Sequence, residues 1–195
     1  MTTDRSSPAR PLAPLARTVA RAFHDDPAWI WILPDEDRRS ALLPYLFERA
    51  LRLESLRGHV HADGDSGVAI WIPPGAPRPT LLQTARSGLV LAPLRLRAGE
   101  RLRLRRYLRA CADLQQRDLA DVWYLSGLAV DPDRQRQGIG SELLRWGLRH
   151  GRVGLLTSNR ANIRFYERSG LRVVGEFWDR DGPPRMWTMR SDVSA

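Results

Sequence analysis

Hydrophobic and polar positions follow two different rhythms along the chain, and together they predict a domain of mixed helices and strands. Apolar residues three to four positions apart form one face of a helix, whereas short apolar runs between turn residues are typical of strands. The first rhythm predicts helices over residues 11–23, 38–57, 81–91 and 100–116, with a shorter one within 24–34. The second predicts strands over residues 59–62, 68–72, 123–130, 153–156, 171–178 and 185–189.

Turn and capping residues mark several of these boundaries. Residues 63–65 (Asp-Gly-Asp) predict a turn that joins the first two strands into a hairpin. Thr80 and Gln83 have the spacing of a capping box at the start of the third long helix. Pro44 predicts a kink or restart within residues 38–57, and Gly58 predicts the end of that helix.

The length and composition fit one globular domain. The chain has 195 residues, of which 43% are hydrophobic, enough for a substantial core. We expect residues 1–10 to be disordered, followed by a single domain over residues 11–195. The first ten residues lack the apolar segment of a secretion signal, and no stretch reaches the roughly 18 apolar residues of a membrane span. The lone Cys111 excludes an internal disulfide and favours a buried packing role, so a cytoplasmic protein is expected.

The chain is strongly basic, and it contains arginine but no lysine. Its net charge is +9, and the densest arginine run lies within residues 95–109. Leu104, Tyr107, Leu108 and Cys111 recur there at helical spacing, so we expect an amphipathic helix with a solvated arginine face. No nucleic-acid reading motif accompanies the charge, which therefore does not favour nucleic acid as a partner. A positive field would instead attract a polyanionic small molecule.

A glycine-rich turn after the strand at residues 123–130 has the layout of an anion site. The run Gln135-x-x-Gly138-x-Gly140 follows the strand, and a helix opens at Gly138. Glycine lets the backbone approach a phosphate closely, and the free amides and dipole of a helix start attract it. The run has too few glycines for a dinucleotide fold, and a P-loop is excluded because the chain has no lysine.

A second strand-helix segment lies further along the chain. The apolar run 153–156 leads into Thr157-Ser158-Asn159, which are helix-start residues, and a helix of about three turns should end near Gly170. This helix carries Asn162 and the pair Phe165-Tyr166.

The two segments resemble the acetyl-CoA-binding elements of the GNAT superfamily of N-acetyltransferases. The resemblance implies an α/β (α+β) fold whose mixed, mostly antiparallel sheet has about six or seven strands and is flanked by helices. It also implies that Gly127 marks a bulge where one strand parts from its neighbour and admits acetyl-CoA. The residues that it assigns to acetyl-CoA are Leu128, Ala129, Val130, Gln135, Arg136, Gln137, Gly138, Ile139, Gly140, Ser141, Asn159, Asn162 and Tyr166.

Within GNAT, the chain is most similar to the puromycin N-acetyltransferase group. The shared features lie in residues 22–27, 68–74 and 182–187. Leu156 stands where relatives often carry an acid, which bears on the identity of the acceptor. The strand that usually precedes the first helix is poorly visible in residues 1–10, which bears on one edge of the sheet.

Tyr166 matches the tyrosine that faces the CoA sulfur in the family, and the resemblance therefore implies a general acid. A phenol has a pKa of about 10, so it can donate a hydrogen bond and a proton to a departing thiolate, whose pKa is about 8.5. The alternative is that Tyr166 only packs its helix against the sheet.

The base and the acceptor pocket are less constrained by the sequence. An ammonium with a pKa of about 10 must lose a proton before it attacks, and no glutamate lies on the strand at residues 123–130. Asp26 and Tyr124 lead as candidate bases, and the remaining candidates are Asp25, His59 and His61. Candidates to line an apolar acceptor pocket are Trp29, Trp31, Trp71, Trp123 and Trp178, although core packing is expected for at least half of them.

These observations predict an acetyl-CoA-dependent N-acetyltransferase that acts on a primary amine of a small molecule. The amine would attack the thioester directly in a ternary complex, and no metal is expected. The inserted helices between residues 79 and 117 should close the acceptor side into a pocket. Two alternatives stay open, namely acetylation of a protein or peptide and a non-catalytic acyl-CoA-binding regulator. The sequence does not determine the acceptor, the acyl chain or the oligomeric state, and a homodimer is among the possibilities.

Overall fold

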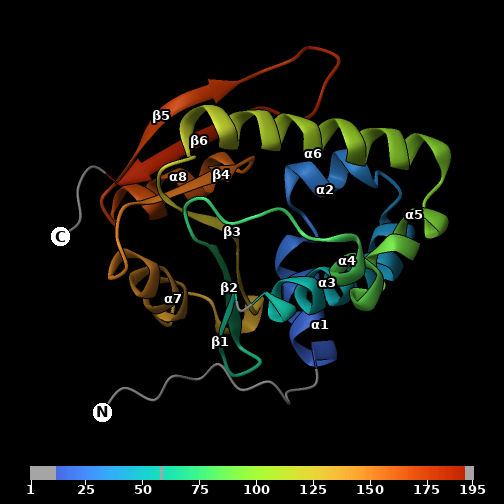
Figure 1. Ribbon diagram of the computed structural model, residues 1–195, viewed down its shortest axis with the longest axis horizontal. Helices are drawn as coiled ribbons and strands as arrows, with labels where there is room; N and C mark the ends of the chain where they lie inside the picture. The colour runs from blue at the N-terminus through green and yellow to red at the C-terminus, as the bar shows by residue number, and fades with distance from the viewer. Residues whose placement is uncertain (1–11, 58, 192–195) are drawn as a thin grey trace.

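The computed structural model describes residues 12–57 and 59–191, which fold around one six-stranded sheet (Figure 1). The strands are β1 (Val60–Asp63), β2 (Gly67–Ile72), β3 (Trp123–Val130), β4 (Val153–Thr157), β5 (Leu171–Phe177) and β6 (Met186–Ser191). The helices are α1 (Leu12–Phe23), α2 (Pro27–Ile32), α3 (Glu36–Leu56), α4 (Leu81–Ser87), α5 (Ala92–Arg95), α6 (Ala98–Asp118), α7 (Ile139–Leu148) and α8 (Arg160–Glu167). Two 3₁₀ turns are η1 (Leu89–Leu91) and η2 (Pro132–Arg134).

The sheet is mixed and mostly antiparallel, as predicted. Its strand order is β1-β2-β3-β4-β6-β5, and the β3–β4 pair is parallel whereas the other pairs are antiparallel. A parallel pair needs a crossover connection, and α7 supplies it between β3 and β4. β5 and β6, the last two predicted strands, form an antiparallel pair at one edge of the sheet.

The two central strands separate along their length. β3 and β4 pair only over Trp123–Leu125 and Val153–Leu155; beyond this, β3 continues along β2, and β4 continues along β6. The register of β3 against β2 shifts because Ile70 pairs with Gly127 while the next residue pairs with Leu125. Ser126 is therefore the extra residue of a bulge, one position from the predicted site, and a bulge bends its strand away from a neighbour.

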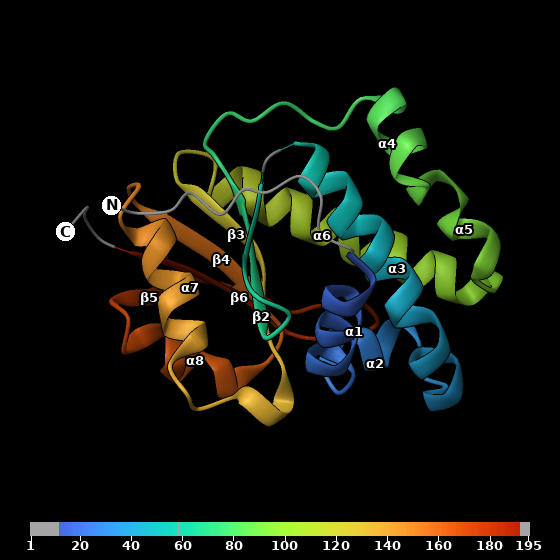
Figure 2. The same cartoon turned by 90° about the horizontal axis from the view of Figure 1, so that it is seen from below.

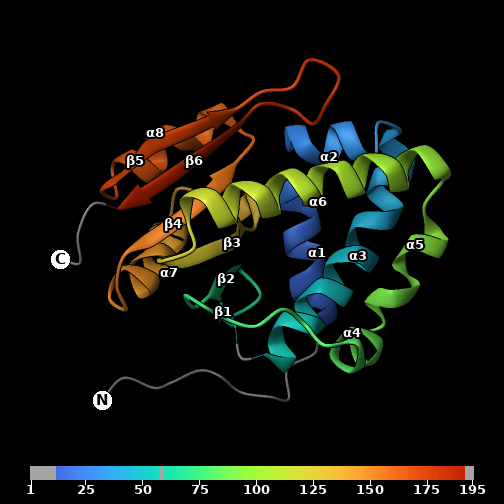
Figure 3. The same ribbon diagram turned by 45° about the horizontal axis from the view of Figure 1, so that its top comes forward.

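Helices cover both faces of this sheet (Figure 2). α7 and α8 pack on one face, where Leu143 and Leu144 of α7 are buried with Leu155 of β4. α1 packs on the other face, where Leu15 is buried with Ala129 of β3. α3 lies outside α1, and the inserted segment from α4 to α6 encloses α3. Long α6 runs across the molecule beside α2 (Figure 3).

Several predicted helix boundaries are corrected by the structure. α3 runs through Pro44 without a restart, and it ends at the cap residue Arg57. The helix predicted over residues 81–91 stops at Ser87 because Gly88 adopts a left-handed conformation with φ of 76°, and the 3₁₀ turn η1 follows. The capping box at its start is confirmed, since the Thr80 hydroxyl accepts from the Gln83 amide at 3.2 Å.

Two further predictions are refined. α8 has eight residues, which is two turns and not three, and its cap is Arg168, with Gly170 following in a left-handed conformation. Leu108 does not join the inward face of α6, because its side chain is 56% exposed.

The predictions for residues 1–10 and Gly58 lie outside the described residues. Among residues 12–57 and 59–191, no helix is long and apolar enough to cross a membrane.

Candidate active site

The loop between β3 and α7 has the backbone of an anion site. Gly138 caps α7 with φ of 88°, and Arg136 is also left-handed with φ of 63°. Alternation between right- and left-handed residues can point successive amides into one concavity. The first amide of this helix that bonds to the loop is that of Glu142, which donates to the Gly138 carbonyl at 3.0 Å. The three amides before it, from Ile139 to Ser141, therefore have no acceptor within the helix.

An arginine from a distant part of the chain holds the start of this loop. Arg21 of α1 donates to the Asp131 carboxylate at 3.0 and 3.1 Å and to the Asp133 carboxylate at 2.8 Å. The Asp131 carboxylate also accepts from the Asp133 amide at 2.9 Å. These hydrogen bonds hold the loop against α1. The positive charge of Arg21 also offsets the negative charges of Asp131 and Asp133, which lie beside a loop suited to anions.

The second predicted segment lies directly beside this loop. Asn159 caps α8, and its side chain accepts from the Ala161 amide at 3.0 Å. A Cβ atom on Gly140 would lie 3.5 Å from the ring of Phe165, so α7 and α8 are in close contact there. The neighbouring Tyr166 is 8% exposed and packs with the core beneath α7.

Asp26 lies between α1 and α2, directly before the first residue of α2. It caps α2, and its carboxylate accepts from the Ala28 amide at 2.9 Å. Burial raises the pKa of this carboxyl, and the amides of Ala28 and Trp29 partly oppose the rise. Burial likewise raises the pKa of Tyr166 well above its usual range, and the negative charge of Asp26 raises it further. Asp26 therefore influences the charge state of Tyr166.

Tyr107 of α6 is a third sheltered residue, after Asp26 and Tyr166, whose pKa is raised. Its pKa is raised mainly by burial, and then by the neighbouring Cys111, Asp26 and Tyr124. Its hydroxyl also lies beside that of Ser158, an interaction that lowers the pKa. The helical spacing of Tyr107 predicted only a packing role, although its place one turn before Cys111 on the inward face of α6 is the signal that could have identified it.

Tyr124 of β3 and Cys111 of α6 are two further sheltered residues with raised pKa values. Burial is the main cause that raises the pKa of Tyr124 far above its usual range. Burial also raises the pKa of the Cys111 thiol to about 11, so this thiol is protonated at neutral pH. The Cys111 sulfur lies 3.9 Å from that of Met186, which fits the predicted packing role.

Asp26 differs from the other sheltered carboxylates in having no cationic partner. Five other carboxylates that are not exposed each pair with an arginine, namely Glu48, Glu54, Glu100, Asp118 and Asp131. Among the described residues, Asp26 is in no ion pair. Burial of a carboxylate that has no cationic partner costs free energy. Within the described part of the chain, Asp26 is unpaired even though the chain has a net charge of +9, so its carboxylate can bind a cation from outside the chain.

The predicted tryptophans do not share one pocket. Trp71 is 1% exposed, and its ring covers Gly147 and lies 6.2 Å from Trp146. Trp123 packs against the same Trp146, on the α7 face of the sheet. A single tryptophan-lined pocket is therefore not found, because these two rings form core on the α7 face. Trp29 and Trp31 lie in α2, directly after Asp26, and are partly buried.

The other candidate bases contact different groups or are exposed to solvent. The imidazole of His59 contacts the Glu54 carboxylate at 2.9 Å, and that of His61 stacks on Trp146 at 4.9 Å. The Asp25 side chain is 86% exposed. The described residues contain no group of three or more side chains suited to a metal ion.

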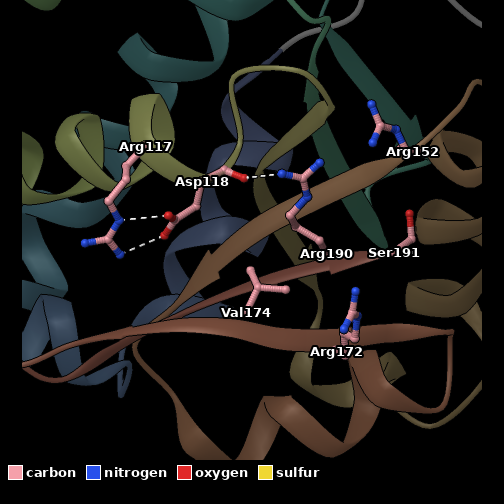
Figure 4. A pocket seen from close by; sticks show the side chains of 7 residues that line it. All are labelled: Arg117, Asp118, Arg152, Arg172, Val174, Arg190 and Ser191. Atoms are coloured by element: carbon pink, nitrogen blue, oxygen red, sulfur yellow. Dashed lines mark hydrogen bonds and ion pairs between the residues drawn. The ribbon is translucent and has the colours of Figure 1, made fainter. Parts of the chain in front are cut away.

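An arginine-lined hollow lies at the other end of the sheet (Figure 4). It is bordered by Arg117, Asp118, Arg152, Arg172, Val174, Arg190 and Ser191. Arg117 donates to the Asp118 carboxylate at 2.8 Å, and Arg190 donates to the Asp118 carbonyl at 2.7 Å. None of the predicted site residues lines it, so it is separate from the site around Tyr166.

Comparison with known proteins identifies the domain. Residues 103–172 match the family model described as an acetyltransferase (GNAT) domain. The fold is similar to that of a histone acetyltransferase HPA2 and related acetyltransferase from Corynebacterium glutamicum, with a TM-score of 0.62, 22% identity, and coverage of 97% of this chain and 96% of that one.

Two further solved structures share the fold. One is a polyamine N-acetyltransferase from Drosophila melanogaster, with a TM-score of 0.54, 14% identity, and coverage of 90% and 91%. The other is arylalkylamine N-acetyltransferase 2 from Aedes aegypti, with a TM-score of 0.54, 12% identity, and coverage of 93% and 94%. The predicted GNAT fold is confirmed by these structures, and residues 103–172 match the model of a GNAT acetyltransferase domain.

Proposed function

We propose that this enzyme transfers the acetyl group of acetyl-CoA to a primary amine of a small molecule, by direct attack in a ternary complex. The observation that carries the proposal is the sheltered Asp26 carboxylate, which has no cationic partner among the described residues and whose charge contributes to the raised pKa of Tyr166. A substrate ammonium would supply the missing positive charge.

Acetyl-CoA would bind where β3 and β4 separate. Beyond Leu125, one edge of β3 has no strand partner, so backbone groups of Leu128, Ala129 and Val130 are available to the amide-rich arm of CoA. The run from Gln135 to Ser141 would hold the pyrophosphate, with Arg136 and Gln137 in the turn and amides at the α7 start. Asn159 and Asn162 lie at the start of α8, beside this path.

The chemistry then follows from the proton positions. Asp26 binds the ammonium and takes one proton, and the neutral amine attacks the thioester carbonyl carbon. As the carbon–sulfur bond breaks, the second proton of the nitrogen passes to the departing sulfur, which leaves as a thiol. Asp26 afterwards returns its own proton to water.

Tyr166 would act on the departing sulfur mainly as a hydrogen-bond donor. Burial and the charge of Asp26 both raise the pKa of this phenol, so it stays protonated during the reaction. A thiolate has a pKa of only about 8.5, so complete proton transfer from such a phenol is unfavourable. Stabilisation of the developing charge by a short, well-placed hydrogen bond is the larger contribution.

The acceptor would be an amine with an aromatic or apolar body. Trp29 and Trp31 follow Asp26 in α2 and are the predicted aromatic residues that remain beside the site. The puromycin N-acetyltransferase group stays our finer proposal for the relatives, with Leu156 as the departure that bears on the acceptor. A cytoplasmic location and a homodimer likewise stay predictions.

One assay separates this proposal from its alternatives. Release of free CoA is measured with a panel of small amines and with histone-like and N-terminal peptides. Peptides that are acetylated far faster than every small amine would favour the protein acetyltransferase, and the fold shared with a histone acetyltransferase keeps that alternative open. Tight CoA binding without transfer to any acceptor would favour the regulator.

Two variants test the assigned roles. Tyr166→Phe should bind acetyl-CoA normally and lower kcat by about 10²-fold, because the hydroxyl acts on a charge that develops only in the transition state. Asp26→Asn keeps the helix cap but loses the base, so kcat/KM at neutral pH should fall by a similar factor. Wild-type kcat in either variant, with chemistry shown to be rate-limiting, would refute that residue's role.

A further inference from the structure

The hydroxyl of Ser158 is buried without a hydrogen-bond partner. Ser158 directly follows β4, beyond the point where β4 has separated from β3, and it is 8% exposed. No described group hydrogen-bonds its side-chain oxygen. Nearly all buried hydroxyls in proteins have a partner, so an exception needs an explanation.

Tyr107 packs beside the helix that Asp26 caps. Its ring lies against the apolar cluster that contains Ile32 of α2, and Asp26 caps the start of this helix. The Tyr107 hydroxyl neighbours that of Ser158, but the two do not meet the geometry of a hydrogen bond. The charge of Asp26 contributes to the raised pKa of Tyr107. Tyr107 therefore relates the carboxylate without a cation, at the start of α2, to the hydroxyl without a partner.

We propose that the Ser158 and Tyr107 hydroxyls bind a second polar group of the acceptor, a hydroxyl or carbonyl next to the carbon that bears the amine. The inference rests on the proposed transfer to an amine, because it takes the ammonium at Asp26 as its origin. With the nitrogen there, we expect the neighbouring carbons of the acceptor to lie toward Ser158. A hydroxyl or carbonyl at that place can satisfy the buried side chain.

The proposal makes the enzyme selective in a particular direction. A site built to hydrogen-bond a substrate hydroxyl rejects the analogue that lacks it, because the buried polar groups are then left unpaired. A site that merely packs an apolar amine would accept the analogue equally well. Ser158 and Tyr107 would therefore be specificity-determining residues.

A pair of acceptors that differ by one hydroxyl tests this directly. We would compare 2-amino-1-phenylethanol with 2-phenylethylamine, using kcat/KM for the wild type, Ser158→Ala and Tyr107→Phe. The wild type should prefer the amino alcohol by roughly tenfold, which corresponds to one hydrogen bond of ordinary strength. Ser158→Ala should remove most of that preference, because the hydroxyl that pairs with the amino alcohol is gone.

Stability supplies a readout that does not depend on turnover. Ser158→Ala removes no hydrogen bond, so its melting temperature should equal or exceed that of the wild type. The matched control is Ser87→Ala, because Ser87 is also buried but its hydroxyl donates to the Thr84 carbonyl at 2.8 Å. Ser87→Ala should therefore melt lower while keeping the preference between the two acceptors.

The outcomes separate this inference from the proposed function. Equal kcat/KM for the two amines in the wild type, or an equal loss for both in Ser158→Ala, would overturn the inference alone. If no amine is acetylated, the proposed function fails, and calorimetry with both amines on the CoA complex still decides the inference. Equal dissociation constants would overturn it, whereas tighter binding of the amino alcohol that Ser158→Ala removes would support it.

Discussion

Replacing Gly138 by alanine should abolish CoA binding while leaving the fold intact. Gly138 caps α7 with φ of 88°, and a Cβ atom built on it would meet no other atom within 4 Å. The methyl group would therefore project into the open space in front of the loop, where the proposed pyrophosphate site lies. The substitution places a side chain against the ligand and not against the protein.

The expected magnitudes separate strain from loss of binding. An L-residue at this φ costs about 1–2 kcal/mol, which lowers the melting temperature of a chain of this size by about 2–8 °C. In the wild type, CoA at 100 times its dissociation constant should add about 2.7 kcal/mol, or roughly 5–11 °C. The variant should melt lower without ligand and should show almost none of that rise.

Gly170→Ala is the matched control. Gly170 has φ of 85°, and its Cβ position is equally free of neighbours, but it follows α8 and lies outside the loop. It should show the same loss of stability without ligand and should keep the full rise with CoA. Melting scans at low salt, with and without CoA, give all four values. A full CoA-dependent rise in Gly138→Ala would refute the assignment of this loop to the pyrophosphate.

Three further predictions follow from buried groups. Burial raises the pKa of the Asp26 carboxyl above its ordinary value of 3.8, so the folded protein favours the protonated form. The stability that protonated Asp26 contributes is complete below its ordinary pKa, and it is lost as the pH rises through the raised pKa of the folded protein. Asp26→Asn should therefore melt higher than the wild type at pH 7, with the gain vanishing toward pH 4; a constant difference from pH 4 to 8 would contradict this. Gly147→Ala should lose about 1–3 kcal/mol in chemical denaturation because the added methyl overlaps the Trp71 ring, whereas Gly99→Ala, which meets only the end of an arginine, should be neutral or stabilising. The Cys111 thiol, with a pKa of about 11, should react slowly with iodoacetamide at pH 8 in the native protein, and rapid stoichiometric labelling would show that it is accessible and ionised.

Local signals were enough to predict many of the elements from the sequence. The capping box at Thr80, the cap at Asn159 and the helix start at Gly138 each depend on residues within one turn of one another, so spacing alone predicts them. The six strands were predicted for the same reason, since their apolar runs end at turn residues. The bulge near Gly127 was implied by the family resemblance, because a lone glycine in a strand does not by itself fix where the register shifts.

Tertiary structure alone decided which residues share the site. Asp26, Tyr107 and Ser158 lie on three segments separated by about 80 and 50 positions, and no spacing rule connects them. The separation of Trp71 from Trp29 is equally a matter of which face of the sheet each element covers. A side chain's partners across the core depend on how layers pack, and that packing is a property of the whole chain. The isolation of Asp26 became visible only when the arginine partners of the other sheltered carboxylates had been placed.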